Sequence, residues 1–547
     1  MSHRDWLARH GPFALLVVFL FVLAVYVDRY LDAFTYILLN SRLFFQLFVG
    51  ITAIAAVRNI AGVKAFGAFG PAIIAVAFLQ AGLLFGALLL LNILAIVIAT
   101  RELIRRELIQ QDHRIAILVI LVGLSIVLLE ILAEYFHYPS FDYSFLFPVL
   151  ILAWTAERYV EEVDRTGWEL PSRKLFWTLG LVLLAFGVMA QAWLVDAVIL
   201  TPLSWPLLVL ANWYLGTHVR FRISERFRFR PTTARPDGPV PPDDVLTMNV
   251  RNREYIAKYN PPERFAYLTK ARAKDLLASH GVPVPETHIL LEGREDLGRL
   301  EAFLREARAF VVKPAQGHGG EGILVVRSRR ADGFDTNQGP MSAEDIVEHA
   351  QYVLTGAFGG DGGDVVLVEA LVEQHASLRE LVPEGLADVR VIALLGFPAM
   401  AMARLPTRES KGRANLHSGA VGCGIELSTG RIVHATWRGR PVTKHPDTGA
   451  RIVGTTIPFW SEILDVATQA QVVSGLGYAG IDVVLDAARG PLVLEVNRRP
   501  GLEIQNANRA GLLRRLRAIE RLRGRGELDD RVGAAMDLDV GGWEAPA

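Results

Sequence analysis

The sequence has little cysteine and no net charge. Its 547 residues include a single cysteine, Cys423, which excludes a disulfide framework or a cysteine zinc site within one chain. The 57 basic and 57 acidic side chains cancel, so no global field favours a nucleic acid. We therefore expect no nucleic-acid partner, and the cysteine count fits a reducing compartment for the soluble part of the chain.

Two common nucleotide-binding signatures are missing from the glycine-rich segment at 317–322. It lacks the GxxxxGK[ST] pattern of a Walker loop. It is followed by a strand-like stretch rather than a helix, which excludes a dinucleotide fingerprint. Any nucleotide site here must have another design.

Hydrophobic residues make up 51% of the chain, and the excess lies before Arg220. Several apolar stretches reach the ~20 residues that a helix needs to cross a bilayer. The first stretch lacks the small-x-small pattern of a cleaved signal peptide, so we expect it to remain in the protein. The stretches cover residues 12–27, 43–61, 65–81, 83–100, 115–133, 143–158, 174–194 and 197–216.

Basic residues set the predicted topology. The loops at 135–143 and 195–205 contain no lysine or arginine, whereas arginines gather at 101–114, 158–174 and 220–230. Cytoplasmic loops carry the excess of these residues. We therefore expect a multi-pass protein of the inner (cell) membrane whose C-terminal domain lies in the cytoplasm.

The number of spans depends on residues 66–99, which are nearly uncharged. Glycines interrupt this stretch and favour two spans, which gives eight in all and places both termini in the cytoplasm. One long tilted helix would give seven.

The composition changes to that of a soluble protein after the last apolar stretch. A basic and aromatic segment, which anionic membrane lipid would attract, leads into a proline-rich linker. We expect a polytopic α-helical membrane domain at 1–219, the basic segment and linker at 220–244, an α+β domain at 245–523, and a disordered tail at 524–547.

Patterning of apolar residues predicts the elements of the α+β domain. The expected helices are 270–279, 342–354, 460–474 and 508–523. The expected strands are 287–291, 309–313, 322–326, 365–369, 389–395, 399–404, 480–485 and 491–496.

A lysine-led glycine-rich loop joins two of these strands. Lys313 ends the first strand, and Gly317, Gly319 and Gly320 follow it. Glycines let a backbone approach phosphate oxygens closely, and the lysine supplies a point charge. The segment predicts a hairpin flap over phosphates, although an ordinary hairpin turn has the same pattern.

Three oxygen-bearing side chains lie on the last two predicted strands. Glu495 and Asn497 alternate with apolar neighbours, so both point to one face. Asp482 lies thirteen residues before Glu495, on the other strand. Oxygen ligands of this kind suit Mg²⁺, the ion that accompanies nucleotide phosphates.

With these motifs, residues 246–520 resemble the ATP-grasp superfamily, and within it the alpha-L-glutamate ligase homologues. Residues 1–219 resemble, with one extra helix, a seven-helix domain usually joined to an inactive transglutaminase-like domain. The matching words in the first resemblance are Met248-Asn249, Arg251-Asn252, Gly281-Val282-Pro283-Val284-Pro285, Val312-Lys313-Pro314, Met400-Ala401-Met402-Ala403-Arg404, Ala414-Asn415-Leu416-His417, His445-Pro446-Asp447 and Glu495-Val496-Asn497.

The resemblance implies roles at the nucleotide. Lys270 and Lys313 resemble the lysines that hold the α- and β-phosphates of ATP. Glu369 resembles the acidic residue of the adenine hinge, and Val372 lies in the hinge segment that offers backbone groups to the base. Asp388 resembles the contact to the ribose.

The resemblance also implies the reacting groups. Arg404, Arg413 and Asn415 resemble groups around the γ-phosphate and an acyl phosphate. The oxygen set on the last two strands resembles the ligands of Mg²⁺, with Mn²⁺ as the alternative ion. The implied activity is a membrane-anchored, ADP-forming ligase that joins a carboxylate to an amine, with glutamate, another amino acid or a peptide as substrate.

Two other functions stay open from the sequence. One is a transporter regulated by a nucleotide-binding domain, although the spans hold few polar residues. The other is a non-catalytic membrane scaffold. The chain differs from its proposed family in one respect. Many ATP-grasp enzymes carry an additional α/β domain before the first lysine, but only about 25 residues separate the linker from Lys270, which is too few for such a domain. A protein partner or the cytoplasmic loops would then complete the substrate site.

Overall fold

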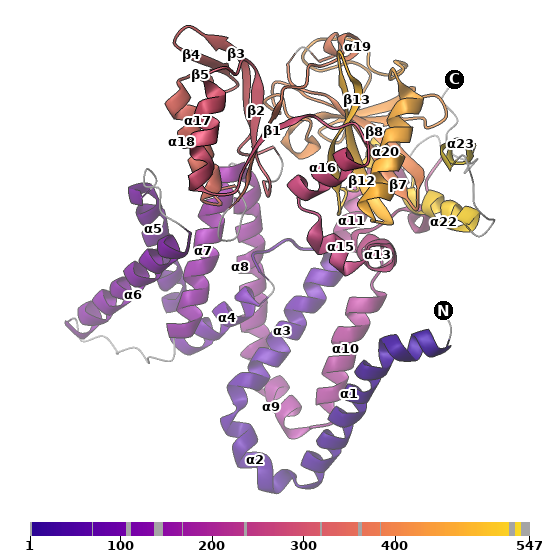
Figure 1. The fold of residues 1–547 in the computed structure, drawn as a ribbon. Helices are drawn as coiled ribbons and strands as arrows, with labels where there is room; N and C mark the ends of the chain where they lie inside the picture. The colour runs from indigo at the N-terminus through magenta and orange to yellow at the C-terminus, as the bar shows by residue number, and fades with distance from the viewer. Residues whose placement is uncertain are drawn as a thin grey trace. The chain divides into compact units, whose positions relative to one another are not determined.

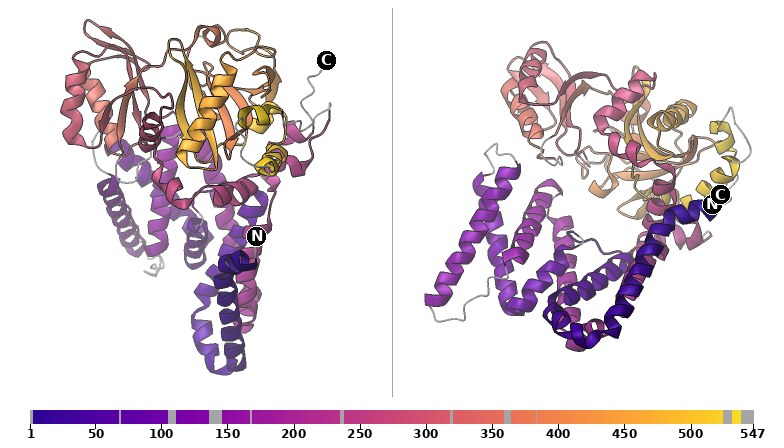
Figure 2. Two further views of the ribbon diagram at one scale, coloured as in Figure 1. Left: turned by 45° about the vertical axis from the view of Figure 1, so that its right-hand side comes forward. Right: turned by 60° about the horizontal axis from the view of Figure 1, so that its bottom comes forward.

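The computed structural model describes residues 3–67, 69–104, 111–135, 146–166, 168–234, 238–317, 320–358, 364–382, 384–523 and 531–537. The chain divides into two compact units, Met1–Ser224 and Glu225–Ala547. Figures 1 and 2 show that the first unit is built from helices and that the second holds the β-sheets.

The described part of the N-terminal unit consists of helices. They are α1 (His3–Arg29), α2 (Leu31–Asn40), α3 (Arg42–Ala61), α4 (Gly70–Ala81), α5 (Leu83–Ile104), α6 (Gln111–Tyr135), α7 (Leu146–Thr166), α8 (Glu169–Met189), α9 (Ala192–Leu200) and α10 (Ser204–His218). Each predicted apolar stretch contains a helix, and α2 is an addition that the sequence did not predict.

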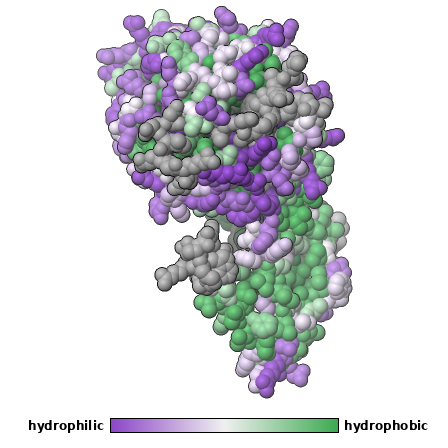
Figure 3. Space-filling view, turned by 90° about the vertical axis from the view of Figure 1, so that its right-hand side faces the viewer, coloured by the Kyte–Doolittle hydropathy of each residue, from purple (hydrophilic) through white to green (hydrophobic). Residues whose placement is uncertain are grey.

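The surface of this unit is rich in exposed apolar side chains. Figure 3 shows hydrophobic residues covering the helical part of the molecule on the face in view. Leu15, Phe44 and Leu124 are 72%, 63% and 61% exposed. Apolar surface of this extent is unfavourable in water and marks a contact with another apolar medium, which for long apolar helices is lipid.

Three helical segments among the described residues are long and apolar enough to cross a membrane: Gly11–Arg29, Arg42–Ala61 and Glu169–Met189. A fourth arises if α9 and the helix after it, which are bent by 109° at their break, form one span. Three further apolar helical segments among the described residues are shorter, namely Gly70–Gln80, Gly86–Thr100 and Ala116–Leu129. The predicted total of eight spans, or seven, therefore stays a prediction.

Residues 66–99 form two helices rather than one. Helix α4 ends before Gly82, whose φ of +80° lies in the left-handed region that glycine adopts at little cost. Helix α5 begins at the next residue. The glycine-interrupted pattern of the sequence predicted this break.

The C-terminal unit contains two antiparallel sheets. The smaller sheet has the strand order β1-β6-β2-β3-β4-β5. Helices α17 (Leu297–Leu304) and α18 (Ala343–Leu354) contribute apolar residues to its core. Its strands are β1 (Thr287–Leu291), β2 (Phe310–Pro314), β3 (Leu324–Arg330), β4 (Gly333–Thr336), β5 (Gly339–Met341) and β6 (Val366–Ala370).

The larger sheet has the strand order β11-β10-β9-β8-β7-β12-β13. Helices α16 (Lys270–Ser279) and α20 (Trp460–Ser474) bury their apolar faces with it in one core. Its strands are β7 (Asp388–Leu394), β8 (Phe397–Leu405), β9 (Val421–Ile425), β10 (Ile432–Trp437), β11 (Arg440–Val442), β12 (Tyr478–Asp486) and β13 (Gly490–Asn497).

Short helical turns precede α16, and no strand occurs between Glu225 and Thr269 in the described residues. They are α11 (Ile223–Arg228), α12 (Arg230–Thr233), a 3₁₀ turn at Pro242–Asp244, α13 (Met248–Val250), a π-helical turn at Arg251–Ile256, α14 (Ala257–Tyr259) and α15 (Pro262–Tyr267). The described residues at this point of the chain therefore contain no additional α/β domain.

Parts of the expected linker and tail are folded. Within the expected linker, Phe229 is fully buried and Arg228 forms a 2.6 Å ion pair with Glu503. Within the expected disordered tail, α23 (Arg531–Met536) buries Ala535, whose carbonyl oxygen accepts a hydrogen bond from Arg515 at 2.7 Å. Burial and hydrogen bonding order these residues.

Candidate functional site

Helix α16 presents Lys270 at its first residue. Thr269 caps the helix, because its hydroxyl oxygen accepts the backbone N–H of Arg272 at 3.3 Å. A helix N-terminus attracts anions through its free N–H groups and its dipole, and a lysine there adds a full positive charge. The Lys270 amine donates a hydrogen bond to the backbone oxygen of Gly317, so it lies at the start of the glycine-rich loop.

The glycine-rich loop is anchored at its base and closely packed where it turns. Asp364 Oδ1 accepts the N–H of Gln316 at 3.0 Å. Gly320 has a φ of +82°, and a Cβ on it would lie 3.0 Å from Cδ of Arg413. Both the backbone conformation and the available space therefore favour glycine. Arg413 lies against this loop, and the predicted Gly319 falls outside the described residues.

Two lysines hold the buried carboxylate of Glu369. Lys274 Nζ lies 2.5 Å from Oε1, and Lys313 Nζ lies 2.7 Å from Oε2. Lys313 on β2 and Glu369 on β6 are diagonal neighbours on one face, because Lys313 pairs with Leu367 in the register. Burial lowers the pKa of the Lys274 amine to about 8, with Glu369 opposing this shift and Lys313 adding to it.

Four buried charges form a network across β8, β7 and β12. Arg390 donates to both oxygens of Asp482, at 2.6 and 2.5 Å. Arg404 donates to both oxygens of Asp388, and its Nη2 also lies 2.8 Å from Asp482 Oδ2. The strand register brings these side chains together, since Asp482 pairs with Arg390 and Asp388 pairs with Arg404. We call these four residues the arginine–aspartate network.

The two aspartates of the network have pKa values shifted in opposite directions. Burial raises the pKa of Asp388 to about 6, and the negative charge of Asp482 adds to this, against the opposing effects of Arg404 and Arg390. Burial also raises the pKa of Asp482, but Arg390 and Arg404 outweigh it and hold that pKa below its usual range. Asp482 is thus the better stabilised carboxylate.

The predicted metal ligands are neighbours in the sheet. Asp482 on β12 and Glu495 on β13 are directly paired residues, and Asn497 lies two positions further on the same face. The Glu495 carboxylate is half-buried and has no hydrogen-bonded or ion-paired partner in the described part of the chain. The side-chain oxygen of Asn497 accepts the N–H of Arg499 at 3.3 Å.

These oxygen donors fit a hard divalent cation only in part. The free carboxylate of Glu495 and the amide oxygen of Asn497 are suitable ligands for Mg²⁺. Both oxygens of Asp482 are held by arginines, so it could coordinate only by sharing or releasing one of them. The described residues contain no group of three or more histidine, cysteine, aspartate or glutamate side chains that could hold a metal ion.

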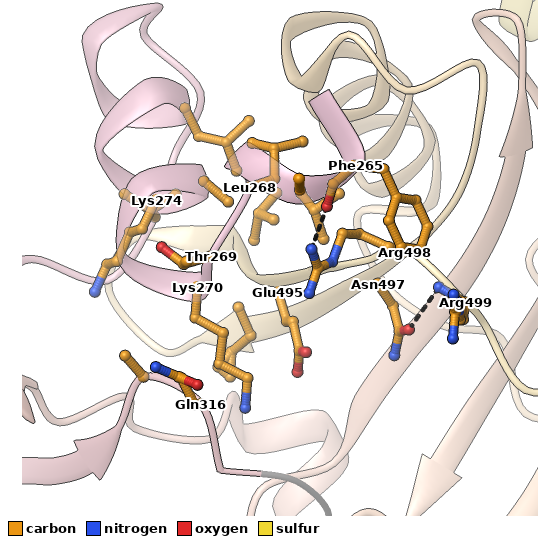
Figure 4. Close-up of a pocket in the computed structure, with 18 residues that line it drawn as sticks. Phe265, Leu268, Thr269, Lys270, Lys274, Gln316, Glu495, Asn497, Arg498 and Arg499 are labelled. Atoms are coloured by element: carbon orange, nitrogen blue, oxygen red, sulfur yellow. Dashed lines mark hydrogen bonds between the residues drawn. The ribbon is translucent and has the colours of Figure 1, made fainter. Parts of the chain in front are cut away.

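A cavity of about 580 Å³ lies between α16 and β13. This volume is within the range of small-molecule sites. Figure 4 shows the side chains of Lys270, Gln316, Glu495 and Asn497 directed into the same space, whereas Arg498 turns back to the backbone of Phe265. Apolar residues close the other side of the cavity, namely Leu268, Ala273, Leu277, Val284 and Val493.

The loop between β8 and β9 carries Arg413 and Asn415. Thr407 ties this loop together, because its hydroxyl donates to the carbonyl oxygen of Gly419 and its N–H donates to Ser410 Oγ, both at 2.9 Å. Asn415 Oδ1 accepts the N–H of His417 at 3.0 Å. The loop is therefore held by its own hydrogen bonds.

The structure distributes the predicted site residues over five places. Val372 is half-buried just after β6. The cavity holds Lys270, Glu495 and Asn497; the lysine pair at β6 holds Lys313 and Glu369; the arginine–aspartate network holds Asp388, Arg404 and Asp482; and Gly317, Gly320, Arg413 and Asn415 lie in loops.

Sequence reasoning missed several residues at the site. Lys274 follows Lys270 by four positions on one helix, a spacing that places both on the same face. Arg498 and Arg499 directly follow the Glu-x-Asn motif and line the cavity. Each guanidinium lies 5.0 Å from the ring centre of Phe265. No sequence spacing pointed to Phe265.

The two units match two family models. Residues 250–521 match the family described as sugar-transfer associated ATP-grasp. Residues 38–233 match the family described as seven transmembrane helices usually fused to an inactive transglutaminase. The C-terminal unit therefore belongs to the ATP-grasp superfamily, and it follows a membrane domain of the seven-helix type.

Curated relatives resemble the C-terminal half. A probable alpha-L-glutamate ligase of Serratia proteamaculans is 28% identical over 261 residues, which are 47% of this chain and 65% of that protein. The ribosomal protein bS6–L-glutamate ligase of Salmonella newport is likewise 28% identical over 261 residues, with the same coverage. The chain thus spans about 65% of the length of the curated relatives it matches.

Solved structures of ATP-grasp ligases resemble the chain at low identity. The D-cycloserine synthetase DcsG is 21% identical, with a TM-score of 0.28, and the match covers 47% of this chain and 71% of that one. The D-alanine–D-alanine ligase of Bacillus anthracis, complexed with ATP, is 14% identical, with a TM-score of 0.25, and the match covers 49% of this chain and 64% of that one. At these scores the likenesses add nothing to the family assignment.

Proposed function

We propose that this protein is a membrane-anchored, ADP-forming carboxylate–amine ligase. The observation that carries the proposal is the free Glu495 carboxylate beside Asn497, facing Lys270 across the cavity between α16 and β13. A lysine at a helix N-terminus and two oxygen donors opposite it suit a phosphate chain with its divalent cation.

The nucleotide would lie between the two sheets. Lys270 and Lys313 would hold its phosphates beneath the glycine-rich loop, and the segment from Glu369 to Val372 would receive the adenine. Asp388 would contact the ribose only after a change in its bond to Arg404, which occupies both of its oxygens in this structure.

The proposed chemistry has two steps. An oxygen of the substrate carboxylate attacks the γ-phosphorus of ATP, so that ADP leaves and an acyl phosphate forms. The amine then attacks the acyl carbon, phosphate leaves with the electrons of the broken C–O bond, and the amine loses a proton. Arg404, Arg413 and Asn415 would stabilise charge on the transferring phosphoryl group and on the acyl phosphate.

Glu495 and Asn497, with Asp482 if it releases an arginine, would hold Mg²⁺. This ion would neutralise charge on the β- and γ-phosphates. Mn²⁺ is the alternative ion. The lysine and arginine side chains of the site would bring the ATP phosphates and the substrate carboxylate together against their charge repulsion.

The substrates we propose are an amino acid or a peptide, and glutamate is the first to test, because the names of the curated relatives specify it. The basic loops of the membrane domain support an inner-membrane location with the ATP-grasp domain in the cytoplasm. The membrane domain would contact lipid, and a protein partner or its own loops would complete the acceptor site that the missing α/β domain leaves open.

Purified full-length protein in detergent micelles tests this function. ATP and Mg²⁺ should give little ADP alone and much more once an amino acid is added. A transporter or a scaffold would show no such dependence on an added amino acid.

A further inference from the structure

The carboxylate of Glu369 has two lysine partners from different elements. Lys313 reaches it from β2 in the sheet, and Lys274 reaches it from α16. The side chains are 4%, 15% and 8% exposed for Glu369, Lys313 and Lys274. The cluster is thus desolvated, and each oxygen of the carboxylate faces one amine.

The cluster contains two lysine amines but only one carboxylate, so it has an excess positive charge when all three groups are ionised. One lysine would neutralise Glu369, and a second buried ammonium costs desolvation energy without an anion of its own. The Lys274 amine lies 2.5 Å from Oε1 of Glu369, and no other partner for this amine occurs among the described residues. A bound anion would supply the missing negative charge.

Only one of the two lysines has a predicted role at the nucleotide. Lys313 is the last residue but one of β2, which leads into the glycine-rich loop, so a short side-chain movement would bring its amine under that loop. If Lys313 left Glu369 without a replacement, a buried carboxylate would remain without a compensating charge, which is strongly unfavourable. A second cation on Glu369 removes this cost.

We propose that Lys274 is a positioning residue that neutralises Glu369 and so frees Lys313 to bind the phosphates of ATP. The inference rests on the proposed nucleotide site, and it adds a residue to which sequence reasoning gave no role. Lys274 does not touch the phosphates in this account. It acts through Glu369, and its effect should disappear when Glu369 carries no charge.

Other charged groups near Lys274 are few. Asp275 on the same helix slightly favours its charged form. Lys270 and Glu495 line the same cavity from α16 and β13. Helix α20 packs against α16, but its acidic residues Glu462 and Asp465 are exposed. Glu369 is therefore the carboxylate in ion-pair contact with Lys274 among the described residues.

Binding of ATP with Mg²⁺ to the full-length protein in detergent micelles tests the proposal. We compare wild type, Lys274→Met, Glu369→Gln and the double variant by isothermal titration. Lys274→Met should weaken binding by about tenfold, a typical coupling between interacting sites. The same substitution should have less than about a threefold effect in the Glu369→Gln background, because no carboxylate then holds Lys313. Lys444→Met, at an exposed lysine, is the matched control.

The pH dependence gives a second readout that a purely structural role would not produce. Burial lowers the pKa of Lys274 to about 8, so Lys274 should lose its charge, and wild-type affinity should fall, as the pH rises through about 8. Lys274→Arg keeps the charge, so its affinity should stay constant over this range. This variant also tests the proposal if Lys274→Met does not fold.

Three results decide between the explanations. Wild-type protein that is folded but does not bind ATP refutes the proposed function itself. Wild-type binding together with unchanged binding in Lys274→Met refutes only the role of Lys274. An equal loss in both backgrounds, with no difference between Lys274→Arg and wild type in the pH profile, also overturns it, because Lys274 would then act independently of Glu369.

Discussion

Asp482 and Glu495 are directly paired across β12 and β13, yet their carboxylates have opposite surroundings. Two arginines hold Asp482, whereas Glu495 has no hydrogen-bonded or ion-paired partner among the described residues. A free carboxylate binds a cation without first breaking an ion pair. We therefore expect Glu495 to matter for turnover and Asp482 to matter for both turnover and stability.

Replacing Glu495 tests this distinction first. Glu495→Gln keeps the size of the side chain but removes its charge, so it should lower turnover by roughly 10²-fold or more. Its thermal unfolding should stay close to that of the wild type, since no ion pair is broken. ADP release and a melting curve measure the two effects, and wild-type turnover in this variant would contradict the metal assignment.

The arginine–aspartate network should be a large contributor to the stability of the C-terminal unit. Arg404→Met leaves two buried aspartates with one arginine, and breaking a buried pair costs about 3–5 kcal/mol. Arg438→Met is the matched control, because Arg438 is 64% exposed where it pairs with Glu409, and exposed pairs contribute about 0–1 kcal/mol. Denaturant unfolding measures how much unfolding free energy each variant loses. Equal losses in the two variants would mean that the ion pairs of the network do not form in solution.

The C-terminal unit should fold without the membrane domain, since a span of about 300 residues closes its own core. A fragment from Glu225 should be more stable than one from Asp243, which lacks the buried Phe229 and the ion pair of Arg228 with Glu503. Burial of a phenylalanine contributes ~1.5–3 kcal/mol. Unfolding midpoints of the two fragments measure the difference, and identical midpoints would show that this segment adds nothing.

The membrane topology can be tested with two reporters. A reporter fused after Ala547 should lie in the cytoplasm, because basic residues gather at the exit of the last apolar helix. A reporter inserted near Asp142, in a loop without lysine or arginine, should lie on the other side. Both reporters on one side would refute the predicted number of spans between them.

Strong local patterns allowed much of the fold to be predicted from the sequence. The predicted bounds of α16 and α20 equal the observed ones, and predicted strands cover most of β12 and β13. Periodicity in these segments is long and regular. Strands β9, β10 and β11 were not predicted, because their short segments contain glycines and polar residues that hide the alternation.

Contacts that depend on strand register were beyond sequence reasoning. Asp388 meets Arg404 because a hairpin pairs β7 with β8, and Asp482 meets Arg390 because β12 pairs with β7. A shift of one residue in the pairing register of a strand would turn each of its side chains to the other face of the sheet. The sequence predicted roles for Asp388, Arg404 and Asp482 but none for Arg390, and it could not show that these four side chains hold one another.

The measurement that tests the ligase proposal most directly is ADP release by the purified full-length protein, with and without glutamate or another amino acid, which supplies both a carboxylate and an amine. The proposal predicts that ADP formation from ATP and Mg²⁺ rises on addition of the amino acid and that an amide product appears in equal amount by mass spectrometry. Glu495→Gln should lower both rates by roughly 10²-fold or more. ATP binding by a folded protein that forms neither ADP nor an amide with any amino acid tested would contradict it.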